Sequence, residues 1–196
     1  MTRIVAGLAK GRRIAVPPGQ ATRPTSDRAR EALFSALESI RGGSLGGARV
    51  LDLYAGSGAV GLEALSRGAA QVTLVESSSA AARVCRENVR NLGLEGAQVV
   101  AEKVERFVSA APANAYDIVF LDPPYALAAD DVVAVLNRLR DGWLLYGAVV
   151  VLERASRDGE WKWPDGYAAD RHRRYGEATL WYGRAAGVGD GLPPDV

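Results

Sequence analysis

An acidic, proline-rich turn after an apolar run contains the first residues whose types suggest chemistry. The run 116–121 leads directly into Asp122-Pro123-Pro124-Tyr125. Proline restricts its own backbone and has no N–H, and the residue before it is held extended. The Asp122 carboxylate and nearby carbonyls can therefore accept the hydrogens of one amine, while Tyr125 offers a face on which a base can stack. The alternative is an ordinary strand-ending turn, because Asp-Pro pairs are common there.

A glycine-rich turn follows the apolar run 48–53 and leads into a helical pattern. Its residues are Tyr54, Ala55, Gly56, Ser57, Gly58 and, three positions later, Gly61. The three glycines spell G-x-G-x-x-G, and glycine lets the backbone turn tightly and approach a ligand closely. NAD sites share this fingerprint, and a strand-helix turn without a ligand also fits it, so the glycines alone do not identify a ligand.

Two carboxylates narrow the choice of ligand. Asp52 lies at the end of the strand before the glycines, where it would repel a dinucleotide pyrophosphate but attract a cation or an amine. Glu76 ends the next apolar run, and a carboxylate there can accept hydrogen bonds from both hydroxyls of a ribose. An amine and a ribose without a pyrophosphate describe S-adenosylmethionine better than NAD.

These motifs together resemble the class I S-adenosylmethionine-dependent methyltransferases, and 122–125 is similar to the motif of those that methylate exocyclic amines. The segments 3–7, 10–14 and 23–34, followed by the block 52–68, resemble the bacterial RsmD family. The likeness extends from residue 3 to about residue 184. It implies transfer of a methyl group from S-adenosylmethionine to N2 of a guanine in 16S, small-subunit ribosomal RNA, with ribosomal RNA or the small subunit as the partner.

The resemblance also implies the residues of the site. The expected catalytic residues are Asp122, Pro123, Pro124 and Tyr125. The expected cofactor-binding residues are Asp52, Tyr54, Ala55, Gly56, Ser57, Gly58, Glu76, Ser77, Glu102, Lys103, Val104 and Asp122. Lys103 departs from the family pattern, because such methyltransferases usually have an acidic residue there to hold the adenine amine. Glu102 or the backbone around Val104 is expected to hold the adenine instead.

Apolar runs alternate with helical patterns along the chain, which predicts a parallel sheet covered on both faces. The expected strands are 48–53, 71–76, 97–101, 116–121 and 146–152. The expected helices are 27–40, 59–67, 78–92, 103–109 and 129–140. An antiparallel hairpin of 167–174 and 177–184 is expected at the sheet edge. The fold class is therefore α/β, a Rossmann-like, mostly parallel, doubly wound seven-stranded sheet, with ligands at the carboxyl ends of the strands.

Length and composition indicate one enzyme domain with a short extension. We expect a basic β-hairpin and helix extension over 1–40, a methyltransferase domain over 41–184 and a flexible tail over 185–196. With one cysteine, Cys85, and one histidine, His172, an intramolecular disulfide is impossible and a zinc cluster has too few ligands. No apolar stretch approaches the ~20 residues that span a bilayer. We expect a metal-free, cytoplasmic monomer.

The net charge of +1 hides a basic N-terminus. Among residues 1–30, seven arginines and lysines face one acidic residue, Asp27, which suits an arm that binds a phosphate backbone. The expected RNA-binding residues are Arg12, Arg13, Arg23, Thr25, Arg28 and Arg30, and Arg171, Arg173 and Arg174 could extend this surface. The alternative is a solvated segment, in which Arg28 and Arg30 pair with carboxylates of the body.

Two other functions use part of the same pattern. A DNA adenine-N6 or cytosine-N4 methyltransferase has the same amine chemistry, but its usual target-recognition domain has no room in 196 residues. A catalytically silent RNA-binding assembly factor would keep the fold, although the intact Asp52, Glu76 and Asp122 argue against it. Cys85 lies within an expected helix without an activating neighbour, so a structural thiol is favoured over a nucleophile.

Overall fold

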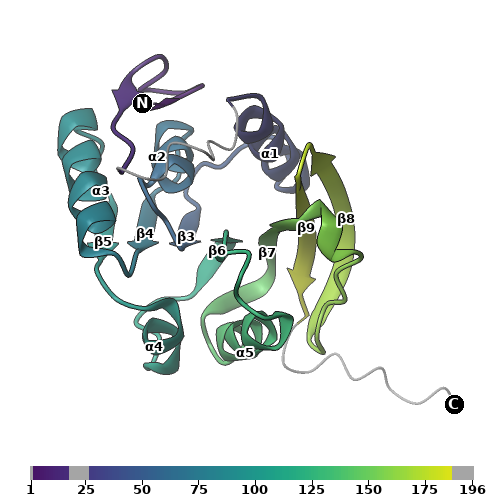
Figure 1. Ribbon diagram of the computed structural model, residues 1–196. Helices are drawn as coiled ribbons and strands as arrows, with labels where there is room; N and C mark the ends of the chain where they lie inside the picture. The colour runs from purple at the N-terminus through teal and green to yellow at the C-terminus, as the bar shows by residue number, and fades with distance from the viewer. Residues whose placement is uncertain (1, 18–26, 187–196) are drawn as a thin grey trace, which may run out of the picture.

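The computed structural model of the protein describes residues 2–17 and 27–186, and its main feature is a seven-stranded sheet in the order β5-β4-β3-β6-β7-β9-β8 (Figure 1). Five strands are parallel: β3 (Arg49–Leu53), β4 (Gln71–Val75), β5 (Ala97–Val100), β6 (Tyr116–Leu121) and β7 (Leu144–Ala155). The remaining two, β8 (Tyr167–Tyr175) and β9 (Ala178–Ala185), form the antiparallel edge hairpin. The predicted fold class is confirmed.

Helices cover both faces of the sheet, because successive residues of each parallel strand point to opposite faces. Val50 packs into one apolar cluster and the next residue, Leu51, into the other. The first cluster lies under α1 (Asp27–Ile40), α2 (Ala59–Ser66) and α3 (Ser79–Leu92). The second lies under α4 (Val104–Ser109) and α5 (Ala129–Arg140). Figure 1 shows these two helical layers above and below the sheet.

Most elements begin and end within a residue or two of the sequence prediction. The largest difference is β7, which was predicted over 146–152 but runs through Glu153 and Arg154 to Ala155. These polar residues interrupt the apolar pattern, yet both are buried. They stay in the strand because β9 pairs with it along its whole second half, up to the Ala155–Ala178 pair.

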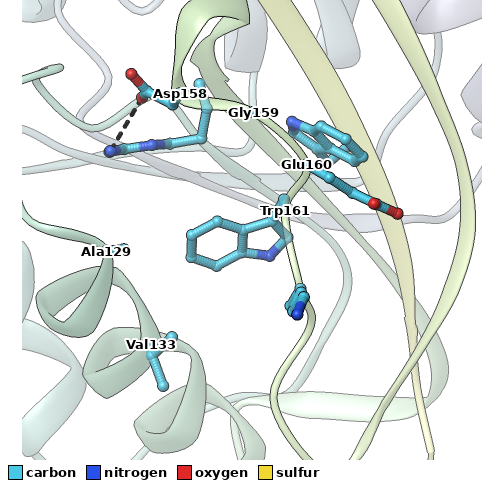
Figure 2. Close-up of a pocket in the computed structure, with 9 residues that line it drawn as sticks. Ala129, Val133, Asp158, Gly159, Glu160 and Trp161 are labelled. Atoms are coloured by element: carbon cyan, nitrogen blue, oxygen red, sulfur yellow. Dashed lines mark ion pairs between the residues drawn. The ribbon is translucent and has the colours of Figure 1, made fainter.

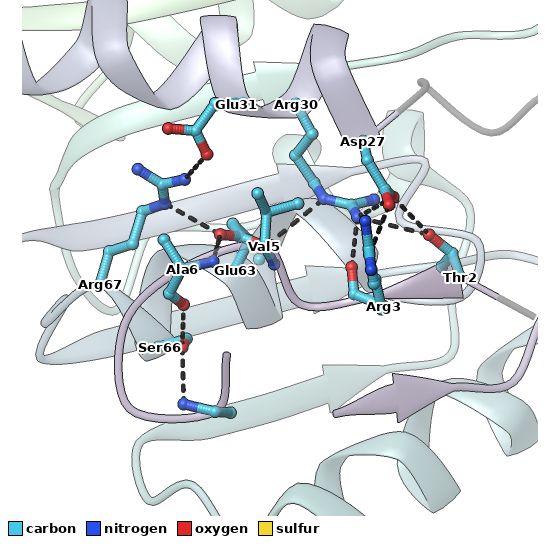
Figure 3. A network of polar contacts seen from close by, with 12 residues as sticks. Thr2, Arg3, Val5, Ala6, Asp27, Arg30, Glu31, Glu63, Ser66 and Arg67 are labelled. Carbon is cyan, nitrogen blue, oxygen red and sulfur yellow. Dashed lines mark hydrogen bonds and ion pairs between the residues drawn. The ribbon is translucent and has the colours of Figure 1, made fainter. Parts of the chain in front are cut away.

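The N-terminal hairpin, residues 2–17, packs against the helices that precede and follow β3. Its two short strands, β1 (Thr2–Arg3) and β2 (Arg13–Ile14), pair antiparallel, and Ile4 and Ile14 belong to the first apolar cluster. Figure 3 shows the polar side of this contact, in which the buried Glu63 carboxylate of α2 accepts the N–H groups of Val5 at 2.7 Å and Ala6 at 2.9 Å. The hairpin is thus part of the same packed body as α2.

Within 2–17 and 27–186, no helix is long and apolar enough to cross a membrane. In the same ranges, no three or more His, Cys, Asp or Glu side chains are grouped so that they could hold a metal ion.

Candidate active site

Three carboxylates lie together at the carboxyl ends of three neighbouring strands. Asp52 is the penultimate residue of β3, while Glu76 and Asp122 directly follow β4 and β6. The strand order β4-β3-β6 and the pairing of Leu53 with both Val75 and Leu121 put the three strand ends at one level. We call Asp52, Glu76 and Asp122 the carboxylate cluster. It occupies the edge of the sheet where parallel α/β proteins bind their ligands.

The charges of the cluster act on one another. The pKa of Asp52 is raised to about 7: burial raises it most, the Gly61 N–H lowers it, and the Asp122 and Glu76 carboxylates raise it. Desolvation penalises the charged form of an acid, and neighbouring negative charges add to that penalty. A cation or an amine placed among these groups would relieve the repulsion, so the cluster is suited to a positively charged ligand.

The glycine loop, residues 54–58, connects β3 to α2 through an unusual backbone. Tyr54 has φ 63°, and Gly56 and Gly58 have φ 55° and 80°. A tyrosine in the left-handed region is strained, and such strain is concentrated at functional sites. The loop closes as a tight turn in which the Gly58 N–H donates to the Ala55 carbonyl at 2.8 Å. The predicted glycine turn is therefore present.

Gly61, the third glycine of the fingerprint, serves packing. A Cβ at this position would lie 2.4 Å from Leu74 Cδ2 on β4, so only glycine lets α2 approach the strand this closely. Its N–H donates to Asp52 Oδ2 at 2.9 Å. Asp52 therefore also anchors the first turn of α2.

Glu76 ties the glycine loop to the start of α3. Its Oε2 accepts the Gly56 N–H at 2.8 Å and its Oε1 accepts the Ser78 N–H at 2.7 Å. A carboxylate has about four lone-pair positions, so these two bonds leave capacity for two hydroxyl donors. Ser77, predicted at the site, lies between Glu76 and Ser78, the residue that caps α3.

The segment 102–104 lies at the end of β5, beside Glu76, whose N–H donates to the Val100 carbonyl at 3.0 Å. Glu102 is half-buried and pairs with Arg106 at 2.8 Å, while Lys103 is exposed at the N-terminus of α4. Val104 is buried as the first residue of that helix. How these residues would hold an adenine remains a prediction.

The loop after β6, residues 122–128, is held from both ends. The Asp122 N–H donates to the Leu53 carbonyl at 3.4 Å, and the Leu127 N–H donates to the Pro124 carbonyl at 2.8 Å. Arg154 of β7 then donates from Nη1 to the Leu127 carbonyl at 3.1 Å. The predicted motif thus forms a fastened loop that begins within the carboxylate cluster.

Arg154 was not expected at the site. Its guanidinium is buried and also pairs with Asp158 at 3.2 Å. A pocket of about 250 Å³ lies between α5 and the 158–162 loop. In Figure 2, Trp161 faces Ala129 and Val133 across this pocket. None of the three cluster carboxylates lines this pocket. Arg154, whose side chain both lines it and binds the Leu127 carbonyl, connects it to the 122–128 loop.

The predicted RNA-binding residues have different surroundings. Arg13 and Arg28 are exposed, whereas Arg23 and Thr25 lie outside the described residues. Arg30 is only 1% exposed, and its guanidinium contacts Asp27, Glu63 and the Arg3 carbonyl (Figure 3). The expectation that Arg30 holds an RNA phosphate is therefore wrong for this structure. Its alternative role, pairing with carboxylates of the body, fits the geometry.

Arg12 has a structural contact as well. Its guanidinium donates to the carbonyls of Asn91 and, at 2.6 Å, Leu92, in the last turn of α3. These carbonyls have no partners within the helix, and a cation is favourable beside them. Arg12 therefore fastens the N-terminal hairpin to α3, whatever else it contacts.

Cys85 does not have the surroundings of a nucleophile. Its side chain is buried, and burial, followed by the Asp52 and Glu76 carboxylates, raises the pKa of its thiol to about 12. A Cβ at Gly58 would lie 2.7 Å from Cys85 Sγ, so the thiol packs directly beneath the glycine loop. The structural role expected for Cys85 fits this position.

Comparison with known proteins agrees with the geometry. Ribosomal RNA small subunit methyltransferase D of Escherichia coli K12 is 35% identical to the chain over 191 residues, which cover 96% of the chain and 93% of that protein. The enzyme of the same name from Haemophilus influenzae is 35% identical over 156 residues, 77% of either chain.

Solved structures show the same architecture. That of yhhF from Escherichia coli superposes with a TM-score of 0.81 at 32% identity, covering 94% of this chain and 97% of that one. Magnesium protoporphyrin IX methyltransferase from Synechocystis, solved with bound S-adenosylmethionine, shares the fold, with a TM-score of 0.62 at 14% identity and coverages of 80% and 79%. The family described as conserved hypothetical protein 95 matches residues 2–184. The chain therefore belongs to this family, the RsmD family of methyltransferases.

Proposed function

We propose that the protein transfers a methyl group from S-adenosylmethionine to the exocyclic N2 amine of a guanine in 16S ribosomal RNA. The observation that carries this proposal is the carboxylate cluster at the ends of three adjacent strands, in a chain whose relatives are named small-subunit ribosomal RNA methyltransferases. The cluster attracts an amine or a sulfonium, and the 122–128 loop opens from it.

The residues at the strand ends fit S-adenosylmethionine. Asp52 carries a raised pKa that a nearby cation would lower, and Glu76 retains acceptor capacity for ribose hydroxyls. Residues 54–58 would lie along the amino-acid part of the cofactor, and 102–104 beside its adenine. The bound cofactor would supply a methyl group on a positively charged sulfur.

The protein's own part in the reaction is to orient a weak nucleophile. The guanine amine delocalises its lone pair into the ring, so the Asp122 carboxylate and the Pro123 carbonyl would accept its hydrogens and direct the lone pair outward. Positioning of reactants can lower a barrier by roughly 7–11 kcal/mol in favourable cases. Asp122 would also stabilise the positive charge that develops on nitrogen, and Tyr125 would stack on the base.

The RNA surface is proposed to run over the helical face that carries the N-terminal hairpin. Arg13 and Arg28 are exposed there, and Arg173 and Arg174 are exposed on β8 at the sheet edge. The hairpin contacts α1 through the Arg3–Asp27 pair, and α1 lies between the hairpin and β8 in Figure 1. Arg23 and Thr25 would join this surface. We place the reaction in the cytoplasm, where ribosomal subunits assemble, and propose a monomer.

The experiment measures methyl transfer from labelled S-adenosylmethionine to small-subunit ribosomal RNA and to assembled small subunits, with duplex DNA in parallel. Nucleoside mass spectrometry then identifies the product. N2-methylguanosine from RNA, absent with Asp122→Ala and retained with the exposed control Asp141→Ala, supports the proposal. Methylated adenine or cytosine in DNA would instead support the alternative function, that of a DNA adenine-N6 or cytosine-N4 methyltransferase. RNA binding without transfer would favour the assembly factor.

A further inference from the structure

The pocket between α5 and the 158–162 loop contains none of the residues proposed to bind the cofactor or the target amine. Its walls are largely apolar. Trp161 faces Ala129 and Val133 of α5 across it, as Figure 2 shows, and the buried Trp181 of β9 also lines it. Pockets for drug-sized ligands usually measure ~300–1,000 Å³. At about 250 Å³, this pocket fits a single ring system better than a whole nucleotide or cofactor.

Trp161 offers the pocket a flat aromatic surface. Its side chain is half-buried, and the ring of Trp163 stands perpendicular to it, with 6.5 Å between the ring centroids. The Trp161 indole N–H is buried and has no acceptor among the described residues, so what a ligand can reach is the ring and not its polar edge. Aromatic faces of this kind bind nucleobases by stacking, because every base has a π-face.

The charged side chains of the pocket are balanced in sign. Arg154 and Lys162 are basic, and Asp158 and Glu160 are acidic. Arg154 and Asp158 pair with each other at 3.2 Å, whereas Glu160 and Lys162 are exposed. The balance favours a neutral ring over a phosphate. An exposed carboxylate can accept the hydrogens of an exocyclic amine, and an ammonium can donate to a ring carbonyl or ring nitrogen. A nucleobase has a polar edge of this kind.

The pocket and the carboxylate cluster lie at opposite ends of the 122–128 loop. Asp122 begins the loop within the cluster. At the other end, the Leu127 carbonyl accepts the Arg154 Nη1 hydrogen at 3.1 Å, and Ala129, the first residue of α5, lines the pocket. A guanine whose amine is held at Asp122 therefore leaves this pocket unfilled. The pocket is placed for another base of the same strand.

We propose that this pocket binds a base of the RNA that neighbours the target guanine, stacked on Trp161 with Glu160 and Lys162 at its polar edge. Two bases held at the two ends of one loop would fix the register of the strand, so that the correct guanine reaches Asp122. Unstacked bases of single-stranded RNA are recognised by such stacking and edge contacts. This inference rests on the proposed function, which places the target guanine at Asp122.

The kinetic test uses the full-length protein and the substrate that the wild type methylates, ribosomal RNA or assembled small subunits. We expect Trp161→Ala to raise KM for this substrate by about tenfold or more and to change kcat by less than about twofold, because a stack on a non-reacting base stabilises substrate and transition state equally. Trp161→Phe keeps a ring face, so its KM should lie between those of Trp161→Ala and the wild type. The affinity for S-adenosylhomocysteine should be unchanged in both variants.

A second pair of variants blocks the pocket from the side of α5. Ala129 is exposed and lines the pocket, so Ala129→Phe would place a ring in the space for the base and should raise KM as Trp161→Ala does. Ala134→Phe is the matched control, because Ala134 is exposed on the same helix and does not line the pocket. It should keep the wild-type KM. Ala129→Phe also provides the test if Trp161→Ala does not fold.

Photocrosslinking identifies what occupies the pocket. Trp161→benzoylphenylalanine places a photoreactive ring in the pocket wall, and primer extension maps the crosslinked nucleotide. We expect a crosslink to a nucleotide next to the methylated guanine. Tyr146→benzoylphenylalanine is the control, because Tyr146 is an aromatic residue, 78% exposed, near the start of β7, whereas Arg154 lies near the end of that strand. It should give no crosslink at that nucleotide.

The outcomes separate this inference from the proposed function. If the wild type methylates guanine N2 but Trp161→Ala and Ala129→Phe keep its KM, or if residue 161 crosslinks to distant RNA or to a ribosomal protein, the pocket role is wrong and the methyltransferase function stands. A lower kcat with an unchanged KM in Trp161→Ala would show that Trp161 only supports the 122–128 loop, and would overturn the inference.

An equal rise of KM in Ala134→Phe and Ala129→Phe would attribute the effect to a disturbed α5 and would likewise overturn the inference. If the wild type does not methylate the RNA, the proposed function fails, and the pocket inference fails with it.

Discussion

The Glu76 carboxylate accepts the backbone N–H of Gly56 at 2.8 Å, so the acid that ends β4 also holds the loop that ends β3. Its second oxygen accepts the N–H of Ser78, the residue that caps α3. A single side chain thus positions the loop and offers acceptor sites to a ligand. Changes at Glu76 will therefore affect both cofactor affinity and local order.

Glu76→Ala should weaken binding of S-adenosylmethionine by about 10- to 100-fold, because each hydrogen bond to a charged group contributes roughly 1.5–3 kcal/mol. Glu76→Gln keeps an acceptor oxygen but loses the charge, so its affinity for S-adenosylmethionine should lie between those of Glu76→Ala and the wild type. Titration calorimetry measures both, and melting curves without ligand report the loss of the Gly56 contact. An unchanged affinity in Glu76→Ala would place the cofactor elsewhere.

Asp122→Ala should lower turnover by about 10²–10⁴-fold, the range of a positioned proton-accepting group, while leaving cofactor affinity within a few-fold. Tyr125→Phe should be milder than Tyr125→Ala, because the stacking face survives in phenylalanine. Single-turnover methyl transfer to RNA measures the chemical step separately from product release. Near wild-type turnover in Asp122→Ala would contradict the amine-binding role.

The sequence predicted the elements and the three carboxylates well, because both depend on short-range patterns. Apolar runs that end in Asp52, Glu76 and Asp122 mark strand ends, and parallel strand ends meet at one edge of a sheet. Glu63 was missed because its partner Val5 is 58 residues away. The sequence does carry one signal for Glu63: it is a charged residue within the otherwise apolar pattern of α2, which indicates a buried carboxylate with a partner.

The raised pKa of Asp52, about 7, predicts two effects of pH. Because the folded-state pKa exceeds the unfolded value of 3.8, the stabilisation from protonated Asp52 is complete below pH 4 and is lost as the pH rises through 7. Asp52→Asn should remove this part of the dependence of melting temperature on pH. A positively charged ligand should lower the pKa of Asp52, so binding near pH 7 should release a proton.

Calorimetry of S-adenosylmethionine binding in buffers of different ionisation enthalpy detects that proton. The same titration with Asp52→Asn provides the control, since any proton that the ligand itself releases is common to both proteins. Equal proton release from the wild type and the variant would show that Asp52 does not respond to the ligand.

Arg154→Met should lower turnover by about tenfold or more without changing cofactor affinity, because the 122–128 loop loses its support at the Leu127 carbonyl. Arg140→Met is the matched control: Arg140 Nη1 donates to another loop carbonyl, that of Asp165, at 2.9 Å, and this loop is away from the carboxylate cluster. The control should keep its turnover. A similar loss in both variants would point to general destabilisation, and no loss in Arg154→Met would mean that the loop holds its shape unaided.

Charge reversal on the N-terminal hairpin tests the RNA surface, and the structure favours Arg13 over Arg12 for this purpose. Arg12 binds carbonyls at the end of α3, so Arg12→Glu would disturb the hairpin as well as any phosphate contact. Arg13 is exposed and next to it, and Arg13→Glu should weaken RNA binding while leaving the melting temperature and cofactor affinity unchanged.

The salt dependence makes this test specific, because each lost phosphate contact reduces the slope of log affinity against log salt by roughly 0.7–0.9. Arg173→Glu on β8 should reduce the slope in the same way if the surface reaches the sheet edge. Arg138→Glu, an exposed position on α5 at the opposite helical layer, should leave the slope unchanged. If Arg13→Glu keeps the wild-type slope and Arg173→Glu lowers it, the RNA lies along β8 and the hairpin serves only to hold α2 and α3 together.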